Sequence, residues 1–241
     1  MRMKSKNMKP ISTLLLIGAN NHDWRRTAPY LQNLLTGSGR FSVTFATDAS
    51  LVLEGDLKNY DLFLLDYNGA SWSDRAQSHF LEAVRNGTGV VVFHAANNAF
   101  AGWTEYEKLV GLLWREGTGH GQFHTFKVDI KDSAHPIMQG VTNFETEDEL
   151  YHRLVSMHAT EVEVLATAYS DPEQGGTGNH EPVLMTTQYG EGRVFHTALG
   201  HVWEGDPNCG YRGCTLVALE NEGFQTTLLR GSEWAANGKV Y

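Results

Sequence analysis

Short apolar segments alternate with amphipathic segments through the first half of this chain. The apolar segments span residues 13–19, 41–46, 60–66 and 90–93, and the amphipathic ones span 28–36 and 73–86. The segment 90–93 is apolar at every position, as in strands that are buried on both faces. The alternation predicts an α/β fold with a mostly parallel central sheet, helices on both faces and right-handed crossovers.

The second half of the chain is richer in β-structure and shows no sign of a second domain. Its patterns predict strands at 123–130, 162–169, 182–189 and 193–199 and a closing helix at 222–237. No linker, repeat or low-complexity segment interrupts it, so we predict a single domain over residues 11–241. Residues 1–10 are predicted to be a disordered leader. The basic start followed by an apolar run looks like a secretory signal, but no clear small-residue cleavage site follows.

The charge balance of the chain limits its partners. Among 241 residues, 19 Lys and Arg face 28 Asp and Glu, which gives a formal net charge of −9. Nucleic acids and anionic membranes bind clustered cations, and the chain has no such cluster beyond its first nine residues. No segment approaches the ~20 apolar residues of a membrane span. Cys209 and Cys214 are too few for a disulfide-rich scaffold. We therefore expect a cytoplasmic protein without a nucleic-acid or membrane partner.

Two predicted strands each deliver histidine near the carboxyl end, where open parallel sheets bind ligands. His94 follows the strand at 90–93, and His196 and His201 belong to the last predicted strand and the turn after it. Imidazole serves as acid, base or metal ligand. His94 and His201 are therefore candidate catalytic residues, and His94, His196 and His201 are candidate ligands of a divalent metal such as zinc. The alternative is that some of these rings pack in the interior.

An acidic cluster precedes an apolar segment at residues 145–152. Asp148 or Glu149 could supply the carboxylate that, with imidazole, makes the minimum set for proton transfer. The alternative is a solvated turn or the start of a helix, where carboxylates suit the helix dipole.

Two further polar residues are candidates for substrate contact. Asn97 could orient a hydroxyl group or an oxyanion, or only cap a following helix. His120 would share one strand face with His124, which either borders a pocket or forms an exposed polar surface. Familiar catalytic motifs are missing from the sequence: a Gly-x-Ser-x-Gly elbow, a phosphate-binding Gly-x-x-x-x-Gly-Lys-Ser/Thr loop and a dinucleotide-binding Gly-x-Gly-x-x-Gly.

The order and spacing of several short motifs resemble the ThuA-like family of trehalose utilisation. The motifs are His22-Asp23-Trp24, Val91-Val92-Phe93-His94-Ala95-Ala96, Asp148-Glu149-Leu150-Tyr151, the segment 190–201 and the helix 223–231. The resemblance spans nearly the whole chain. It implies a flavodoxin-like fold of the class I glutamine amidotransferase type.

The resemblance also implies which chemistry has been lost. Amidotransferases place a catalytic Cys in the turn after the fourth strand, and here that turn reads His94-Ala95-Ala96. Glutaminase chemistry through a thioester is therefore not expected. His196 falls on the strand where amidotransferases keep their catalytic His, so the pocket is expected to persist with different chemistry.

The family name implies a carbohydrate substrate, a trehalose-like glycoside or a keto-sugar. We expect a hydrolase, lyase or isomerase, and the alternative is a non-catalytic sugar-binding or regulatory module. The expected catalytic residues are His94, Asp148, Glu149 and His201, and the expected substrate-binding residues are His22, Trp24, Asn97, His120 and Tyr151. Trp24, Trp72, Trp103 and Trp203 could each stack on a sugar ring or only pack. A homodimer is expected, because it is the commonest symmetric state.

Overall fold

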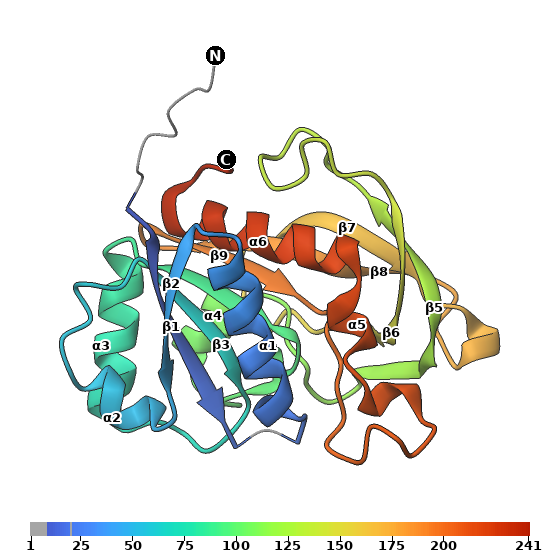
Figure 1. Cartoon of the computed structure of the whole chain (residues 1–241), viewed down its shortest axis with the longest axis horizontal. Helices are drawn as coiled ribbons and strands as arrows, with labels where there is room; N and C mark the ends of the chain where they lie inside the picture. The colour runs from blue at the N-terminus through green and yellow to red at the C-terminus, as the bar shows by residue number, and fades with distance from the viewer. Residues whose placement is uncertain (1–8, 20) are drawn as a thin grey trace.

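The computed structural model describes residues 9–19 and 21–241 (Figure 1). Most of the predicted leader, residues 1–8, lies outside the described residues. The strands are β1 (Ile11–Gly18), β2 (Phe41–Ala46), β3 (Leu62–Tyr67), β4 (Gly89–Phe93), β5 (Gly119–Ile130), β6 (Phe144–His152), β7 (Glu163–Tyr169), β8 (His180–Tyr189) and β9 (Gly192–Thr197). The α-helices are α1 (Trp24–Gly37), α2 (Ala49–Leu53), α3 (Asp74–Arg85), α4 (Thr104–Val110), α5 (Val217–Glu220) and α6 (Glu222–Asn237). Short 3₁₀ helices are η1 (His94–Asn98), η2 (Pro172–Gln174) and η3 (Arg212–Cys214).

All of these strands belong to one sheet with the order β2-β1-β3-β4-β9-β8-β7-β5-β6. The pairs from β2 to β9 are parallel, and those from β9 to β6 are antiparallel. The α/β fold class is thus confirmed, and the sheet is mixed, with a parallel core from β2 to β9 and an antiparallel part beyond it. The physical reason is the short connections in the second half: two residues join β8 to β9, and a parallel pair needs a crossover of a dozen or more.

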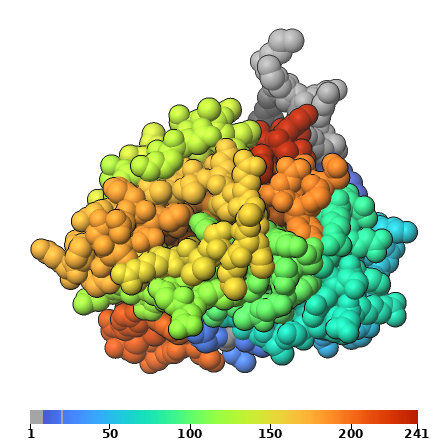
Figure 2. Space-filling model, turned by 180° about the vertical axis from the view of Figure 1, so that it is seen from behind, coloured from blue at the N-terminus to red at the C-terminus, as the bar shows by residue number. Residues whose placement is uncertain are grey.

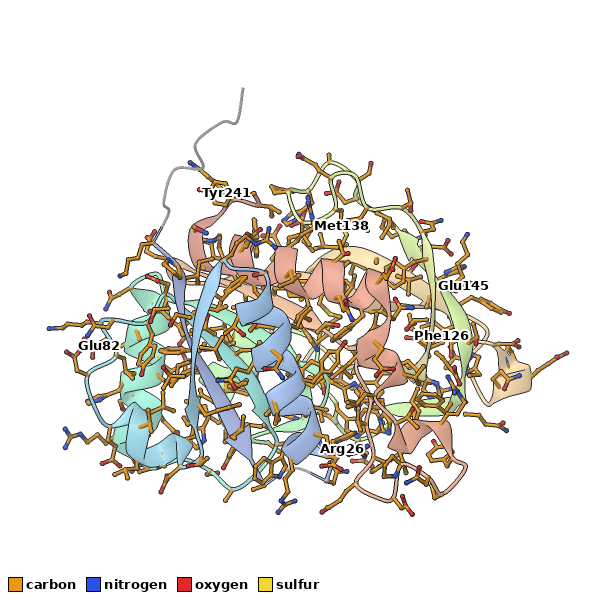
Figure 3. All side chains as sticks on the ribbon, viewed as in Figure 1. Arg26, Glu82, Phe126, Met138, Glu145 and Tyr241 are labelled. Atoms are coloured by element: carbon orange, nitrogen blue, oxygen red, sulfur yellow. The ribbon has the colours of Figure 1, made fainter. Side chains whose placement is uncertain are left out.

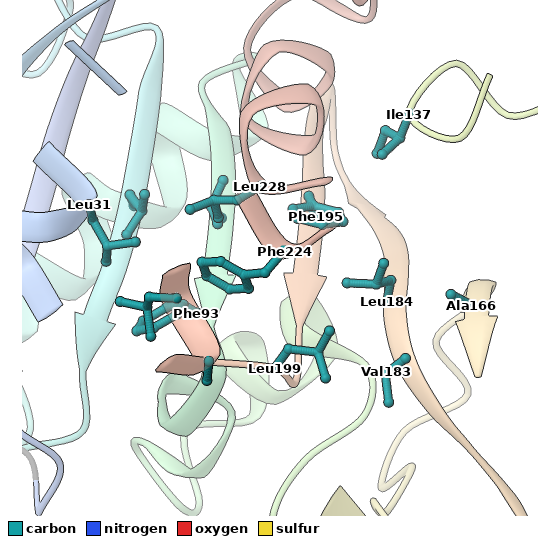
Figure 4. Close-up of a cluster of buried hydrophobic side chains, with 14 of the residues drawn as sticks. Leu31, Phe93, Ile137, Ala166, Val183, Leu184, Phe195, Leu199, Phe224 and Leu228 are labelled. Atoms are coloured by element: carbon teal, nitrogen blue, oxygen red, sulfur yellow. The ribbon is translucent and has the colours of Figure 1, made fainter. Parts of the chain in front are cut away.

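Strand β4 lies inside the sheet between β3 and β9, and both of its faces are apolar. Val91 and Phe93 belong to the core cluster on one face, and Val90 and Val92 belong to the cluster on the other. Helix α6 covers the first cluster; Figure 4 shows Phe224 and Leu228 of α6 among the apolar side chains of β4 and β9. The continuous apolar run in the sequence therefore marked a fully buried strand correctly.

The acidic segment 145–152 is a strand, β6, and not a turn or a helix start. Its inner positions are polar yet fully covered, with Asp148 and Glu149 both 2% exposed or less. Buried carboxylates need hydrogen-bond donors, and these come from segments far away in the sequence. Strand β5 also begins at Gly119, earlier than predicted, which brings His120 into the strand.

The carboxyl ends of the parallel strands meet at one edge of the sheet, the lower edge in Figure 1. Four successive antiparallel steps separate β9 from β6, so β6 ends at this same edge and β5 begins there. Residues after β1, β3, β4 and β9 therefore face the end of β6 and the start of β5. Among the described residues, no helix has both the length and the apolar character needed to cross a bilayer.

Candidate functional site

Three histidines converge at the carboxyl edge of the sheet. His22 follows β1, His94 follows β4, and His201 follows β9. One ring nitrogen from each lies within 4.8 Å of the other two. His201 Nδ1 is 3.2 Å from His22 Nε2 and 3.1 Å from His94 Nε2, and all three rings are buried. We call these three residues the histidine cluster.

His94 is held in one orientation and one tautomer. Its backbone has φ +43°, a left-handed conformation that a residue with a side chain rarely adopts. Strain of this kind concentrates at functional sites. Nδ1 lies 2.7 Å from the carbonyl oxygen of Ala198 and must carry the proton, so Nε2 presents a lone pair to the cluster. The hydroxyl of Tyr151, 2.7 Å away, donates to that nitrogen.

Asp148 fixes the turn that carries His201. Its carboxylate accepts hydrogen bonds from the backbone N–H groups of Gly200 (2.7 Å) and His201 (3.1 Å), and from that of Glu149 (2.8 Å). Gly200 has φ +114°, and a side chain there would also collide with the ring of Phe93. Burial raises the pKa of Asp148 to about 7, against the opposing effect of these hydrogen bonds. Asp148 therefore acts on the position of His201 and does not face the cavity.

Glu149 is the carboxylate that faces the histidine cluster. Its Oε1 accepts hydrogen bonds from Tyr211 Oη (2.6 Å) and Trp203 Nε1 (3.1 Å). Its Oε2 lies 3.4 Å from His201 Nδ1 and 3.2 Å from His120 Nδ1, and is buried without a hydrogen bond to any described residue. One oxygen is thus fixed, and the other remains available for a proton or a ligand.

Burial keeps the rings of the cluster uncharged at neutral pH. Burial, and then the neighbouring His120, lower the pKa of His22 to about 4. The pKa values of His94 and His201 fall far below the usual range, first through burial and then through neighbouring histidines. Neutral imidazole is the form that binds a metal ion.

The donor set fits a divalent ion such as zinc. Zn–N bonds of 2.0–2.1 Å in a tetrahedral site place neighbouring donor atoms about 3.3 Å apart. The two distances from His201 Nδ1 are close to this value. The bond from His94 Nδ1 to a carbonyl is the usual second contact of a metal-binding imidazole.

A cavity of about 100 Å³ opens beside the cluster. It is lined by Asn21, His22, Asn68, Ala95, Asn98, Trp114, His120, Glu149, Tyr151, His201 and Trp203. Trp203 stacks on His22 with ring centroids 5.0 Å apart, and Trp114 meets Tyr151 edge to face. A larger cavity of about 920 Å³ lies elsewhere, between residues 158–163 and the end of β8; Figure 2 shows that face of the molecule, with the yellow segment across it.

The structure brings most of the predicted site residues together and separates three of them. The residues at the cavity or the cluster are His22, His94, His120, Glu149, Tyr151 and His201, with Asp148 directly behind. His196 does not join the cluster formed by the described residues; its Nε2 lies 3.2 Å from Asn97 Nδ2, and both side chains are fully buried. Trp24 packs against the core, with the guanidinium of Arg25 4.5 Å from its ring centroid.

Sequence reasoning missed Trp114 and the three asparagines of the cavity. Asn68 directly follows β3, as His94 follows β4, so its place in the chain was the available signal. Asn21 and Asn98 follow β1 and β4 in the same way. Trp114 gave no signal, because it reaches the cavity from the segment between α4 and β5.

Comparison with known proteins identifies the family. The family model of ThuA, described as trehalose utilisation, matches residues 14–235. The chain belongs to the ThuA family. None of the curated proteins compared with the chain matches it.

Solved structures agree with this assignment. A ThuA-like protein from Parabacteroides merdae is 37% identical, with a TM-score of 0.86 over 96% of this chain and 92% of that one. A ThuA-like protein from Bacteroides uniformis is 17% identical, with a TM-score of 0.71 over 100% and 98%. PurLQS from Thermotoga maritima is 15% identical, with a TM-score of 0.54 over 94% and 99%, and shares the amidotransferase-like fold.

Proposed function

We propose that this ThuA protein is a sugar-catabolic enzyme that acts on a trehalose-like glycoside or its keto derivative. In this proposal His22, His94 and His201 hold a divalent cation, with zinc as the best fit. The convergence of three neutral imidazole nitrogens within 4.8 Å is the observation that carries the proposal. The family description supports the sugar substrate.

The cation would supply Lewis-acid polarisation of a carbonyl or hydroxyl oxygen of the substrate. Glu149 is placed to take a proton, because its Oε2 lies at the cavity without a hydrogen bond to the described residues. Tyr151 holds its proton, since burial and then Asp148 raise its pKa well above the usual range, and so it is a hydrogen-bond donor in the same cavity.

The arrangement of carboxylates favours proton removal beside a carbonyl over direct glycoside hydrolysis. A classical glycosidase needs two carboxylates that both face the scissile bond. Glu149 is the only carboxylate among the described residues that line the cavity, and Asp148 is occupied by three backbone N–H groups. A keto-sugar, whose neighbouring C–H is acidified, therefore suits this site better than an unactivated glycoside.

The test measures metal content and turnover together. The purified protein is assayed for zinc and for turnover of trehalose and 3-keto-trehalose, beside His94→Ala, His201→Ala and the exposed control His180→Ala. We expect zinc near one per chain and turnover of the keto-sugar in the wild type and the control, with both lost in the cluster variants. If the wild type contains no metal and turns over neither sugar, the enzyme proposal is refuted. Saturable sugar binding without turnover would favour a non-catalytic module.

The proposal also includes a cellular location and an oligomeric state. We place the protein in the cytoplasm, which suits its two free thiols, Cys209 and Cys214. We also expect a homodimer, with light scattering after size exclusion as the measurement. A monomer at micromolar concentration would contradict this part alone.

A further inference from the structure

Three asparagines form one wall of the cavity, and each follows a different strand. Asn21 comes after β1, Asn68 directly after β3, and Asn98 at the end of η1 after β4. These strands are neighbours in the sheet order β1-β3-β4. The wall is therefore part of the carboxyl edge of the parallel strands, opposite the residues that come from β5 and β6.

The amide groups of this wall are available to a ligand. Asn21 and Asn98 are exposed and Asn68 is half-buried, and none of the three amides hydrogen-bonds within the described part of the chain; the one bond at Asn98, from Arg115, uses its backbone carbonyl. An amide offers two N–H donors and one carbonyl acceptor. A sugar hydroxyl also donates and accepts, so it matches an amide in either direction.

Among the described residues that line the cavity, none is a lysine or arginine that could bind an anionic sugar. Glu149 is the only residue with a formal charge among the described residues that line it, apart from the histidines. Two guanidinium groups contact the backbone of lining residues, Arg26 at Trp203 and Arg115 at Asn98, and each is already paired with a carboxylate. Arg26 binds Asp23 at 2.7 Å, and Arg115 binds Glu107 at 2.9 Å. Phosphate and carboxylate groups are usually bound by free arginine or lysine side chains.

The start of helix α1, beside the cavity, also lacks an open site for an anion. Flavodoxin-like folds bind phosphate groups beside the first strand, at the start of the helix that follows it. Here the residue before α1 is Asp23, a buried carboxylate. Its partner Arg26 is labelled in Figure 3 at the lower end of α1. The start of this helix is therefore occupied by the Asp23–Arg26 ion pair and offers a phosphate no free cation.

The small size of the cavity and the tryptophans at its border limit what can enter it. A volume of about 100 Å³ holds roughly three water molecules at their ~30 Å³ share of the liquid, so one edge of a single sugar ring can enter it. Trp114 and Trp203 border the same space, and tryptophan faces pack on the C–H face of sugars. A second sugar unit would extend out of the cavity.

We propose that Asn21, Asn68 and Asn98 bind the hydroxyl groups of one uncharged sugar ring and select against phosphorylated and acidic sugars. This inference deepens the proposed function and rests on it for the sugar class. It adds a specificity that the histidine cluster does not determine.

The experiment measures binding of trehalose, trehalose 6-phosphate and glucuronic acid by calorimetry. The proteins are the wild type, Asn68→Ala, Asn98→Ala, Asn98→Lys and the exposed control Asn33→Ala, with and without EDTA. We expect the metal-free wild type, in EDTA, to bind trehalose at least tenfold more tightly than either anion. Each alanine variant should weaken trehalose binding about fivefold, the value of one neutral hydrogen bond. Asn98→Lys should improve binding of the phosphorylated sugar, and the control should match the wild type.

Equal or tighter binding of an anionic sugar by the metal-free wild type would overturn the inference. So would the absence of saturable trehalose binding, or unchanged binding in both alanine variants. The wild type separates the two proposals: if it prefers the uncharged sugar but holds no zinc and turns over neither sugar, the asparagine wall stands and the metal-dependent enzyme fails. In His94→Ala, which should lose zinc and turnover, the preference should persist, because the asparagines do not depend on the histidine cluster.

Discussion

Two buried polar groups in this protein differ in how completely their atoms are hydrogen-bonded. Glu107 on α4 accepts bonds from the N–H of Gly102 (3.0 Å), from Arg115 (2.9 Å) and from His158 (2.9 Å), a set that we call the Glu107 cluster. In the histidine cluster, by contrast, His201 Nε2 is buried without a hydrogen bond to the described residues, and His94 has a strained backbone.

The difference indicates which cluster serves stability and which serves function. Burial acts to raise the pKa of Glu107, but its hydrogen bonds and the charge of Arg115 hold that pKa below the usual value. A fully bonded ion pair fixes the fold around it. The histidine cluster leaves His201 Nε2 buried without a hydrogen-bond partner among the described residues, which costs stability unless a ligand binds. The following variants should separate the two, in order of decreasing effect.

Glu107→Ala should lower the free energy of unfolding by about 3–5 kcal/mol, because it leaves Arg115 buried without its counter-charge. Urea unfolding followed by circular dichroism measures this. Zinc content should stay at the wild-type value, and the exposed control Glu116→Ala should change stability by less than about 0.5 kcal/mol. A loss below 1 kcal/mol in Glu107→Ala would remove the contrast between the clusters.

Asp148→Asn should weaken zinc binding about 10- to 100-fold and should also lower the free energy of unfolding by about 1–3 kcal/mol, because one buried backbone N–H loses its acceptor. The amide can no longer accept from both backbone N–H groups of the turn, so His201 loses its fixed position. A competition titration with a chromophoric chelator measures the affinity. Asp66→Asn is the matched control, a buried carboxyl whose pKa burial raises to about 7 and which bonds Thr27 outside the cavity. Equal zinc affinity in both variants would argue against a positioning role.

His196→Gln should reduce the pH dependence of stability in metal-free protein. Burial lowers the pKa of His196 to about 3, below the ~6.5 of an unfolded chain. The unfolded state then binds more protons, so its contribution to stability is complete above pH 6.5 and is lost as the pH falls toward 3. The loss is about 2 kcal/mol at pH 5 and should be missing in the variant. Parallel curves of unfolding free energy against pH would contradict the burial of this ring.

Tyr151→Phe should cost only about 1 kcal/mol in the metal-free protein, the net value of its bond to His94 Nε2. The ring still packs against Trp114. Chemical unfolding in EDTA measures the change. A loss comparable to that of Glu107→Ala would mean that the histidine cluster also holds the fold together.

The sequence predicted the parallel half of the site better than the antiparallel half. His94 and His201 were predicted as candidates because residues after apolar strands share one sheet edge, and this reasoning needs no long-range information. His196 was predicted beside them, but a residue inside β9 points into the core, where it meets Asn97. Side chains alternate between the two faces of β9, but the face on which His196 lies follows only from the register of β9 with β4.

The antiparallel half depended on contacts that no local pattern encodes. The acidic segment resembled a solvated turn because its hydrogen-bond partners are not visible in the local sequence. The backbone N–H groups that bind Asp148 lie more than fifty residues away, at Gly200 and His201. His22 joined the cluster from the turn after β1, and only the family resemblance had drawn attention to it. Trp114 could not be predicted, because its segment has no regular period.

A zinc-soaked crystal examined at the zinc absorption edge tests the central claim most directly. We predict one strong anomalous peak per chain, about 2.0–2.1 Å from His22 Nε2, His94 Nε2 and His201 Nδ1, with Glu149 beside it. No peak among these three nitrogens under zinc excess, or a peak only at His196 or at the surface, would contradict the account.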